Sequence, residues 1–514
     1  MKMVKSLILG SAAGLIAMSG AQAADLPVKA KAVEYVRICS LYGAGFYYIP
    51  GTDTCIKLGG YLRVDVLANT NSDASGNIAG AGGANNRFTN GYTWRSREDL
   101  NIDTRTATEY GVVRTFFDAT FSWTDDTFSG NGNGASVYGA LGSGNTIVGA
   151  PNNATSGAVA GGTLGVYYAF IQFAGFTIGK AVSQFSTPWQ NYPGNNFDGL
   201  VGGGGTVTGV NQFSYTADFG NGVSGTLSAQ DPTQYYQAGV NNLGAGGAFG
   251  TSDYAGTMAP DFVGMIRVDQ AWGLFQASVA AHDNHVAYYG GTELTGHPAD
   301  KWGWAGQLAV SIKNIPTGAG DTINLQGVYT DGATRYNIQD LSQAGAVTIF
   351  SGTNNPFAYQ SVGVGFAPDT VFVAGGSQQL IQTWGMRGAY THNWNPYWNT
   401  SVYGAWAAVQ YNGTAKTLLC GVGGVGGTIR ATFGTGITSC NPDYNIGQVG
   451  VITRWTPVKN LTFSGDLTWE ALDQKFAGLA AQGSATSTIG KPAALYELKD
   501  QNQFTLLLRA QRNW

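Results

Sequence analysis

The segment "LTFSGDLTWE", residues 461–470, alternates strictly between apolar and polar side chains. One parity holds Leu461, Phe463, Gly465, Leu467 and Trp469, and the other holds Thr462, Ser464, Asp466, Thr468 and Glu470. A period of two predicts a β-strand with one apolar and one polar face. The fold then depends on which face points outward, because the apolar face is inside in a soluble protein and meets lipid in a membrane barrel.

The composition argues against ordinary soluble domains. Charged residues make up 11% of the 514 residues, against about 25% in typical globular proteins. The chain also holds 77 glycines, and aromatic residues reach 12%. No run of 18 or more apolar residues follows the N-terminus, which excludes transmembrane helices. A membrane-spanning β-barrel stays open, because its polar and apolar faces cancel in any average.

The N-terminus has the pattern of a secretory signal peptide. Two lysines precede an apolar run over residues 7–18, and a small-x-small site ends at Ala23. These are the three parts of an export signal. We therefore expect residues 1–23 to be removed on export and residues 24–54 to form a periplasmic N-terminal segment. The barrel would occupy residues 55–514.

The four cysteines fall into two sequence-local pairs, Cys39 with Cys55 and Cys420 with Cys440. Export to an oxidising compartment permits disulfides, so we expect each pair to close a short loop. Neither pair has a histidine or another cysteine at ligand spacing, so we expect no metal site there.

Alternating segments recur along the whole mature chain, and sixteen can be counted. They are 55–67, 92–103, 110–124, 163–174, 175–182, 210–219, 222–230, 262–270, 273–282, 302–314, 320–331, 380–392, 399–412, 443–455, 460–472 and 499–514.

The connections between these segments alternate between short turns and long, irregular loops rich in Gly, Asn, Ser and Thr. Residues 220–222 form a short one and residues 332–379 a long one. Outer-membrane barrels have short periplasmic turns and long outer loops. Lipid offers no partner for the edges of an open sheet, so the sheet must close. We predict an all-β protein, a sixteen-stranded antiparallel transmembrane β-barrel in the outer membrane of a Gram-negative bacterium.

A barrel of sixteen strands is too wide for side chains to fill, so its lumen holds water. The polar parity must then point inward. The first three strands carry many charges on this parity. The residues expected to line the lumen are Lys57, Arg63, Asp65, Arg95, Arg97, Asp99, Asp103, Arg114, Asp118, Asp466 and Glu470. The residues expected to face the membrane are Leu461, Phe463, Leu467 and Trp469.

Glu98 departs from this pattern, because a carboxylate stands at an outward position. A β-bulge would correct its direction. Burial of that surface against another subunit would also account for it, and the sequence leaves both explanations open.

The third long loop, residues 181–209, is the segment expected to fold into the lumen, and Asp198 is its single acid. We expect Asp198 to face a basic wall and to form a constriction with a transverse field that sorts small ions. The alternative is that these charges form ordinary ion pairs away from the constriction. The basic residues of the expected wall are Arg63, Arg95, Arg97, Arg114 and Lys180.

The segment "AVEYVRICSLYGAGFYYIPGTDTCIKLGGYLRVDV", residues 32–66, resembles the N-terminal signature of the alphaproteobacterial porins, the general diffusion porins of the Rhizobiales. The resemblance extends over essentially the whole chain in strand order, loop position and length. It implies a homotrimer and passive diffusion of small hydrophilic solutes and ions. By position, Cys39 and Cys55 match the paired cysteines of the family, and Arg63 matches a basic lumenal position.

The end of the chain, "QFTLLLRAQRNW" at 503–514, resembles the signal that the barrel-assembly machinery reads. Lipid and lipopolysaccharide of the outer membrane are further expected partners. The mildly acidic chain lacks a basic patch for nucleic acid, and it lacks enzyme motifs, so we expect no catalysis and no cofactor. The competing classes are a non-channel outer-membrane barrel and a secreted β-sandwich array.

Overall fold

The computed structural model describes residues 37–70, 85, 92–125, 163–189, 193–197, 199–203, 209–233, 235–244, 254–338, 347–421, 429, 433–482 and 491–514. Its main body is a ring of sixteen antiparallel strands. In chain order these barrel strands are β2 (Thr54–Asn69), β3 (Tyr92–Thr108), β4 (Gly111–Asp125), β5 (Thr163–Phe173), β6 (Phe176–Ala181), β7 (Val210–Gly220), β8 (Val223–Gln230), β10 (Asp261–Gln270), β11 (Gly273–Asn284), β12 (Lys301–Lys313), β13 (Thr322–Asp331), β18 (Gln382–Asn395), β19 (Trp398–Gln410), β21 (Tyr444–Val458), β22 (Leu461–Gln474) and β25 (Gln501–Asn513).

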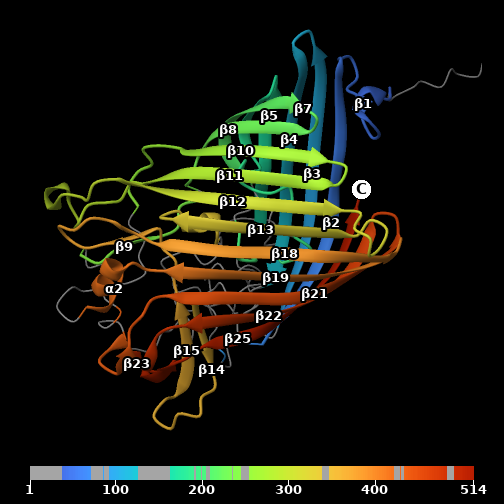
Figure 1. The fold of residues 1–514 in the computed structure, drawn as a ribbon. Helices are drawn as coiled ribbons and strands as arrows, with labels where there is room; N and C mark the ends of the chain where they lie inside the picture. Colours follow the sequence, from blue (N-terminus) through green and yellow to red (C-terminus); the bar gives the residue numbers. More distant parts are fainter. Residues whose placement is uncertain are drawn as a thin grey trace, which may run out of the picture.

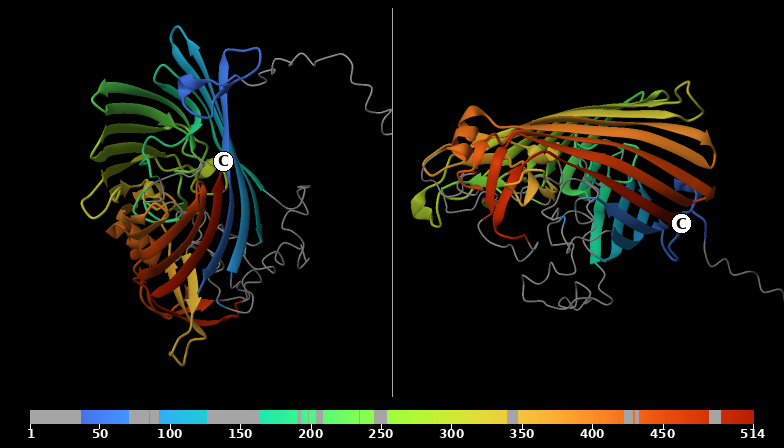
Figure 2. Two further views of the ribbon diagram at one scale, coloured as in Figure 1. Left: turned by 90° about the vertical axis from the view of Figure 1, so that its right-hand side faces the viewer. Right: turned by 90° about the horizontal axis from the view of Figure 1, so that it is seen from below.

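The ring closes through its last strand. β25 runs antiparallel to β2, from Tyr61 opposite Asn513 to Asn69 opposite Thr505. Figure 2 (left) looks along the barrel from the short-turn end, and the C-terminus lies beside β2. Closure gives every barrel strand two hydrogen-bonded neighbours, as a lipid environment demands. The predicted sixteen-stranded antiparallel barrel is confirmed, and most strand bounds agree with the prediction to within a few residues.

Short turns join the strands at one end of the barrel, the right-hand end in Figure 1. The turn between β7 and β8 has Asn221 at φ 51° and Gly222 at φ 73°. Two successive positive φ angles define the type I′ hairpin turn, which matches the twist of the flanking strands. Asn314 and Asn460, in two other short turns, also have positive φ. Asparagine tolerates positive φ better than most residues, so these turns contain the residue type that turn formation favours.

Asp321 fixes the turn between β12 and β13. Its carboxylate accepts hydrogen bonds from Thr317 Oγ1 at 2.6 Å, the backbone N–H of Asn393 at 2.8 Å and Tyr390 OH at 3.0 Å, and His392 Nδ1 lies 2.8 Å away. Burial opposes ionisation, but these bonds outweigh it and hold the pKa of Asp321 well below its usual range. The carboxylate therefore stabilises this turn in its charged form.

Glu98 lies on the outer face of β3, and the bulge considered from the sequence is absent at this position. Glu98 stands opposite Leu62 of β2 and Phe121 of β4, and both ladders run through it without a register shift. The side chain is half-buried on this face. Its outward direction is therefore a property of the regular strand.

The opening segment of the sequence forms β22, and its two parities separate as the alternation predicts. Phe463, Leu467 and Trp469 are 41%, 45% and 40% exposed, whereas Asp466 and Glu470 are fully buried. The apolar parity thus points outward and the polar parity points into the barrel.

The long loops, which the sequence presents as irregular, contain regular structure. A five-stranded sheet joins segments of three loops in the order β14 (Val347–Ser351), β15 (Gln360–Gly365), β24 (Ala494–Leu498), β23 (Ala477–Gln482) and β20 (Ile437–Ser439). A three-stranded sheet joins β17 (Gln379–Leu380), β16 (Thr370–Phe372) and β9 (Val240–Asn242). The short helices are η1 (Ser40–Tyr42), η4 (Glu293–Thr295), η5 (Thr334–Tyr336) and α2 (Gly413–Cys420).

The sequence did not predict these loop sheets, because their strands are short and pair with strands from other loops. They gather at the end of the barrel opposite the short turns, where Figure 1 shows β9 at the left and β14, β15 and β23 at the bottom. Among the described residues, no helix combines the length and the apolar character needed to cross a membrane.

Both predicted disulfides are present, Cys39–Cys55 and Cys420–Cys440. The first ties the N-terminal segment to β2, where β1 (Tyr47–Tyr48) adds two residue pairs to the ladder. The second joins the end of α2 to the segment that follows β20.

Candidate functional site

The loop between β6 and β7 folds into the barrel, as predicted. Its first described part, residues 182–189, is held by glutamine side chains from the inner wall. The carbonyl of Phe185 accepts hydrogen bonds from Gln276 Nε2 of β11 at 3.3 Å and from Gln307 Nε2 of β12 at 2.8 Å. Further along, Trp189 Nε1 donates to Gln326 Oε1 of β13 at 2.8 Å. The loop therefore follows the wall from strand to strand.

The middle of the loop continues across β13, β21 and β22. Asn324 Nδ2 donates to the carbonyl of Pro193 at 2.9 Å. The backbone N–H of Asn196 donates to Asp466 Oδ2 at 2.7 Å, and the Asn196 side chain donates to Ser464 Oγ at 2.7 Å. The carboxylate of Asp466 thus holds the loop through a main-chain group.

The last part of the loop returns over β18. Arg387 donates to the carbonyl of Leu200 at 3.2 Å, and the N–H of Val201 donates to Gln448 Oε1 at 2.9 Å. Gly202 has φ +85°, and a Cβ there would lie 2.3 Å from the carbonyl oxygen of Met386. Only glycine fits this close approach of loop backbone to strand backbone.

An apolar layer lies beneath the loop, and the sequence reading missed it. The loop residues Phe197, Leu200 and Val201 belong to one buried cluster that also includes Ile452 and Leu507 of the inner wall. Part of the inner face is therefore dry and covered, although its strands alternate. The sequence feature that could have indicated this layer is the presence of three apolar residues in a loop that is otherwise rich in Gly and Asn.

Two of the arginines predicted at the constriction form ion pairs within the wall. Arg95 binds Asp65 through its NH2 group at 2.6 Å, and Arg509 of β25 binds the other oxygen of Asp65 at 2.6 Å. Arg114 makes a two-point contact with Asp103, at 3.0 Å for each bond. The carboxylate of Asp103 also binds Arg105 at 2.9 Å.

The other three predicted basic residues each donate a hydrogen bond to a neutral group. Arg97 Nε donates to Ser122 Oγ at 2.9 Å, Arg63 Nε donates to Gln511 Oε1 at 2.8 Å, and Lys180 Nζ donates to the carbonyl of Val166 at 2.8 Å.

Lys57, which was expected to line the lumen, lies near the N-terminal segment. Its ammonium group is 5.9 Å from the ring centroid of Phe46, and the guanidinium of Arg105 is 4.9 Å from the same centroid. The N-terminal segment therefore rests on cationic side chains at the short-turn end of the barrel.

Asp99 and Asp118, the other two acids predicted to line the lumen in the first three strands, lie on adjacent strands and are largely buried, at 3% and 8% exposure. Asp198, the acid expected on the loop, is outside the described residues, so its distance from the arginines is not defined.

Asp466 and Glu470 point inward but do not face open water, because the loop and neighbouring side chains cover them. Both are fully buried. Gln448 Nε2 donates to Glu470 Oε1 at 3.1 Å, and Gln503 donates to the other carboxylate oxygen. The OH of Tyr403 donates to Asp466 Oδ1 at 2.7 Å.

Three arginines that contact the inward loop lay outside the predicted set: Arg387, Arg454 and Arg509. Each occupies an inward position of a late strand and contacts the loop. The same parity rule that identified the early charges would have found them, had it been applied to β18, β21 and β25.

A buried polar cluster links the long loops to the barrel wall near the start of β10 and the end of β11. His282 Nδ1 lies 2.8 Å from Asp261 Oδ1, and Tyr254 OH donates to Asp369 Oδ2 at 2.7 Å. Burial raises the pKa of Asp369, and the charge of His282 and the hydrogen bonds from Tyr254, Thr334 and Ala238 only partly offset this rise.

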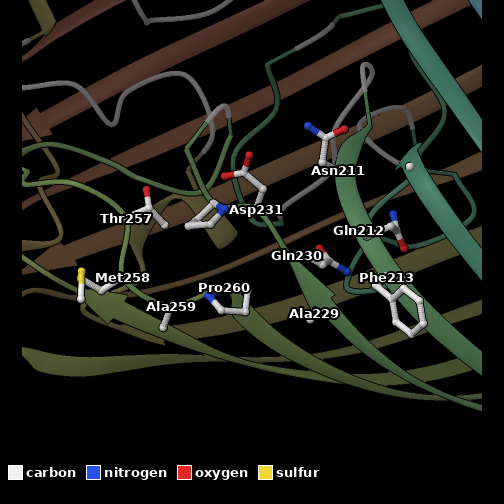
Figure 3. Close-up of a pocket in the computed structure, with 12 residues that line it drawn as sticks. Asn211, Gln212, Phe213, Ala229, Gln230, Asp231, Thr257, Met258, Ala259 and Pro260 are labelled. Carbon is white, nitrogen blue, oxygen red and sulfur yellow. The ribbon is translucent and has the colours of Figure 1, made fainter.

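A pocket of about 520 Å³ lies at the long-loop rim, where β7 begins and β8 ends (Figure 3). Its glutamines, Gln212 and Gln230, also anchor the start of the inward loop. Gln184 Nε2 donates to Gln212 Oε1 at 3.0 Å, and Ser183 Oγ donates to Gln230 Oε1 at 2.8 Å. The pocket therefore belongs to the base of the loop.

No cluster of three or more His, Cys, Asp or Glu side chains that could hold a metal ion occurs within the described part of the chain. The lumen and the loop that folds into it are the candidate site because of the contacts described above.

Comparison with known proteins agrees with this geometry. The sequence profile described as the porin subfamily matches residues 25–507. The porin Omp2b of Brucella suis is 36% identical over 288 residues, which are 55% of this chain and 67% of that protein. Omp2b of Brucella melitensis matches with the same identity and the same coverage.

The solved structure of the outer membrane channel DcaP of Acinetobacter baumannii aligns over 91% of this chain and 99% of that one. It has a TM-score of 0.51 at 15% identity, and it supports the fold alone. The predicted family is confirmed by the profile and by the Brucella relatives. The chain belongs to the porin subfamily and is an outer-membrane porin.

Proposed function

We propose that the barrel forms a water-filled channel through which small hydrophilic solutes and ions diffuse passively across the outer membrane. The observation that carries this proposal is the closed ring of sixteen strands, because a barrel of this size is too wide for inward side chains to fill. Polar inward side chains such as Gln276, Gln307 and Gln326 support it.

The test is conductance of the purified protein in a planar bilayer. We expect current to rise in discrete steps, and we expect vesicles containing the protein to leak small sugars. Protein denatured by boiling is the control. Vesicles that stay sealed to sugars and bilayers that show no steps would contradict the proposal.

The proposed constriction lies between Asp198 and the basic wall of Arg63, Arg95, Arg97, Arg114 and Lys180. The carboxylates bound to Arg95 and Arg114 reduce the field of these two guanidiniums. Arg95→Gln and Arg97→Gln should each shift the reversal potential in a salt gradient towards cation selectivity. An unchanged reversal potential would count against this assignment.

We also propose that three copies assemble and that one interface covers Glu98. A carboxylate on the outer face of a barrel is costly within the hydrocarbon layer, and burial against a second copy would remove it from lipid. Glu98→Leu should weaken the SDS-resistant oligomer that collapses on boiling. An oligomer band of unchanged heat stability would argue against this face.

The remaining proposals follow from the sequence. Residues 1–23 would act as the export signal, residues 24–54 would lie in the periplasm, and residues 55–514 would form the membrane barrel. The barrel-assembly machinery would recognise the C-terminal strand, and lipid and lipopolysaccharide would surround the apolar outer face. No catalysis and no cofactor are part of the proposal.

A further inference from the structure

A cavity of about 330 Å³ lies between the tip of the inward loop and the inner wall. Asn195 and Asn196 form its loop side, and residues of β2, β21, β22 and β25 form its wall side. Its charged lining residues are three arginines, Arg63, Arg454 and Arg509, and its other lining residues are neutral amides and hydroxyls. The predicted constriction includes only one of these arginines.

The guanidinium of Arg454 is held in place by neutral groups. Its NH2 atom donates to the carbonyl of Gly194 at 3.0 Å, and its NH1 atom donates to Ser401 Oγ at 3.1 Å and to Asn399 Oδ1 at 3.4 Å. The side chain is fixed by these bonds, and none of them neutralises its charge.

The acids closest to the cavity are already engaged. Asp65 is shared between Arg509 and Arg95, so one carboxylate serves two guanidiniums. Asp466 accepts from the backbone N–H of Asn196 and from Tyr403. Among the described residues, the lining of the cavity holds three guanidiniums and no carboxylate.

The loop side of the cavity is also polar, because Asn195 and Asn196 line it. The volume suits a small oxyanion and several waters, since a water occupies about 30 Å³.

We propose that this cavity binds a small oxyanion with two or more negative charges, the class that includes sulfate, phosphate and short dicarboxylates. Planar guanidiniums present paired N–H groups that match the oxygens of such anions. The inference rests on the proposed channel function, because the solute must reach the lumen. It extends that function by assigning a preferred solute class to a defined subsite.

The first experiment measures sulfate binding to the folded protein in detergent by calorimetry, with nitrate at equal ionic strength as the monovalent control. We expect saturable sulfate binding and a much weaker response to nitrate. Gln511→Glu changes the charge of the cavity while keeping an acceptor for Arg63, and it should weaken sulfate binding about tenfold, as expected for loss of one charged interaction.

Two further variants separate charge from shape. Arg454→Gln should weaken sulfate binding about tenfold or more, whereas Arg454→Lys should retain part of it. Arg267→Gln is the matched control, because Arg267 lies on β10, bonds to Gln276, and does not line the cavity. It removes the same charge and should leave sulfate affinity unchanged.

Sulfate that binds no better than nitrate to the wild-type protein would overturn the inference, and so would a Gln511→Glu protein with wild-type affinity. A protein that conducts ions but does not bind sulfate would contradict the inference alone. A protein that binds sulfate but gives no conductance would contradict the channel function while the binding site stands.

Discussion

Replacing Asp466 by asparagine should loosen the inward loop without disturbing the barrel. The carboxylate accepts from the Asn196 backbone at 2.7 Å and from Tyr403 OH at 2.7 Å. An isosteric amide has one acceptor oxygen, and its NH2 group must face the other donor. A hydrogen bond to a charged group contributes about 1.5–3 kcal/mol. The loop-open population should therefore rise about 10- to 100-fold, because about 1.4 kcal/mol corresponds to a factor of ten.

Hydrogen–deuterium exchange of the loop peptide around Asn196 measures this population directly. We expect faster exchange there in Asp466→Asn and unchanged exchange in barrel strands far from the loop. Ser464→Ala is the control, since it removes a neutral side-chain bond to the same residue and should accelerate exchange only several-fold. If Asp466→Asn left loop exchange at the wild-type rate in a folded barrel, the proposed role of Asp466 would be refuted.

Three further changes test other parts of the structure. Gly202→Ala places a Cβ against a carbonyl of β18 at a residue with positive φ. Hydrogen exchange in that part of the loop should therefore rise about tenfold or more. Gly352→Ala is the control, because its Cβ meets open space, and it should leave the exchange rate unchanged. Asp321→Asn should lower the thermal midpoint at neutral pH, and the difference should shrink as the pH falls below about 4, where the unfolded wild-type carboxyl protonates, and vanish below the depressed native pKa. A difference independent of pH would contradict this. Replacing Cys420 and Cys440 by serine should destabilise the outer loop sheets by about 3 kcal/mol, seen as local exchange, while channel conductance persists; loss of conductance steps would show that the bond supports the barrel.

The barrel could be predicted from the sequence because a single local rule produces it. Each strand alternates with a period of two, and turn formers such as Asn221 and Gly222 mark the ends. Closure then follows from the chemistry of lipid, which leaves no place for an unpaired edge. The same rule fixed the direction of each side chain in β22. It also placed Glu98 outward, and the regular ladder shows that no bulge corrects this.

The site was less predictable because its partners are distant in sequence. The role of Asp466 depends on a backbone N–H of the loop, 270 residues away. No local pattern encodes that contact. The pairing of Arg95 with Asp65 was also hidden, because parity shows that both point inward but not that they touch. The late-strand arginines are a different case, since parity alone would have identified Arg454.

The regular structure of the long loops could not be predicted either, because it also depends on contacts between distant parts of the chain. β15 pairs in parallel with β24, which comes from a loop more than a hundred residues later in the chain. Such short strands gain their stability from partners, so their own sequence carries little signal.

In the proposed channel, polar side chains enclose water and apolar side chains meet lipid. A spin-label scan of residues 461–470 tests this arrangement most directly. Each position is replaced by cysteine in turn, labelled, and reconstituted in bilayers. Collision rates with oxygen, which concentrates in lipid, should peak at Phe463, Leu467 and Trp469 and fall at the positions between them. Oxygen collision rates that peak instead at Thr462, Asp466 and Glu470, or that show no alternation, would contradict this arrangement.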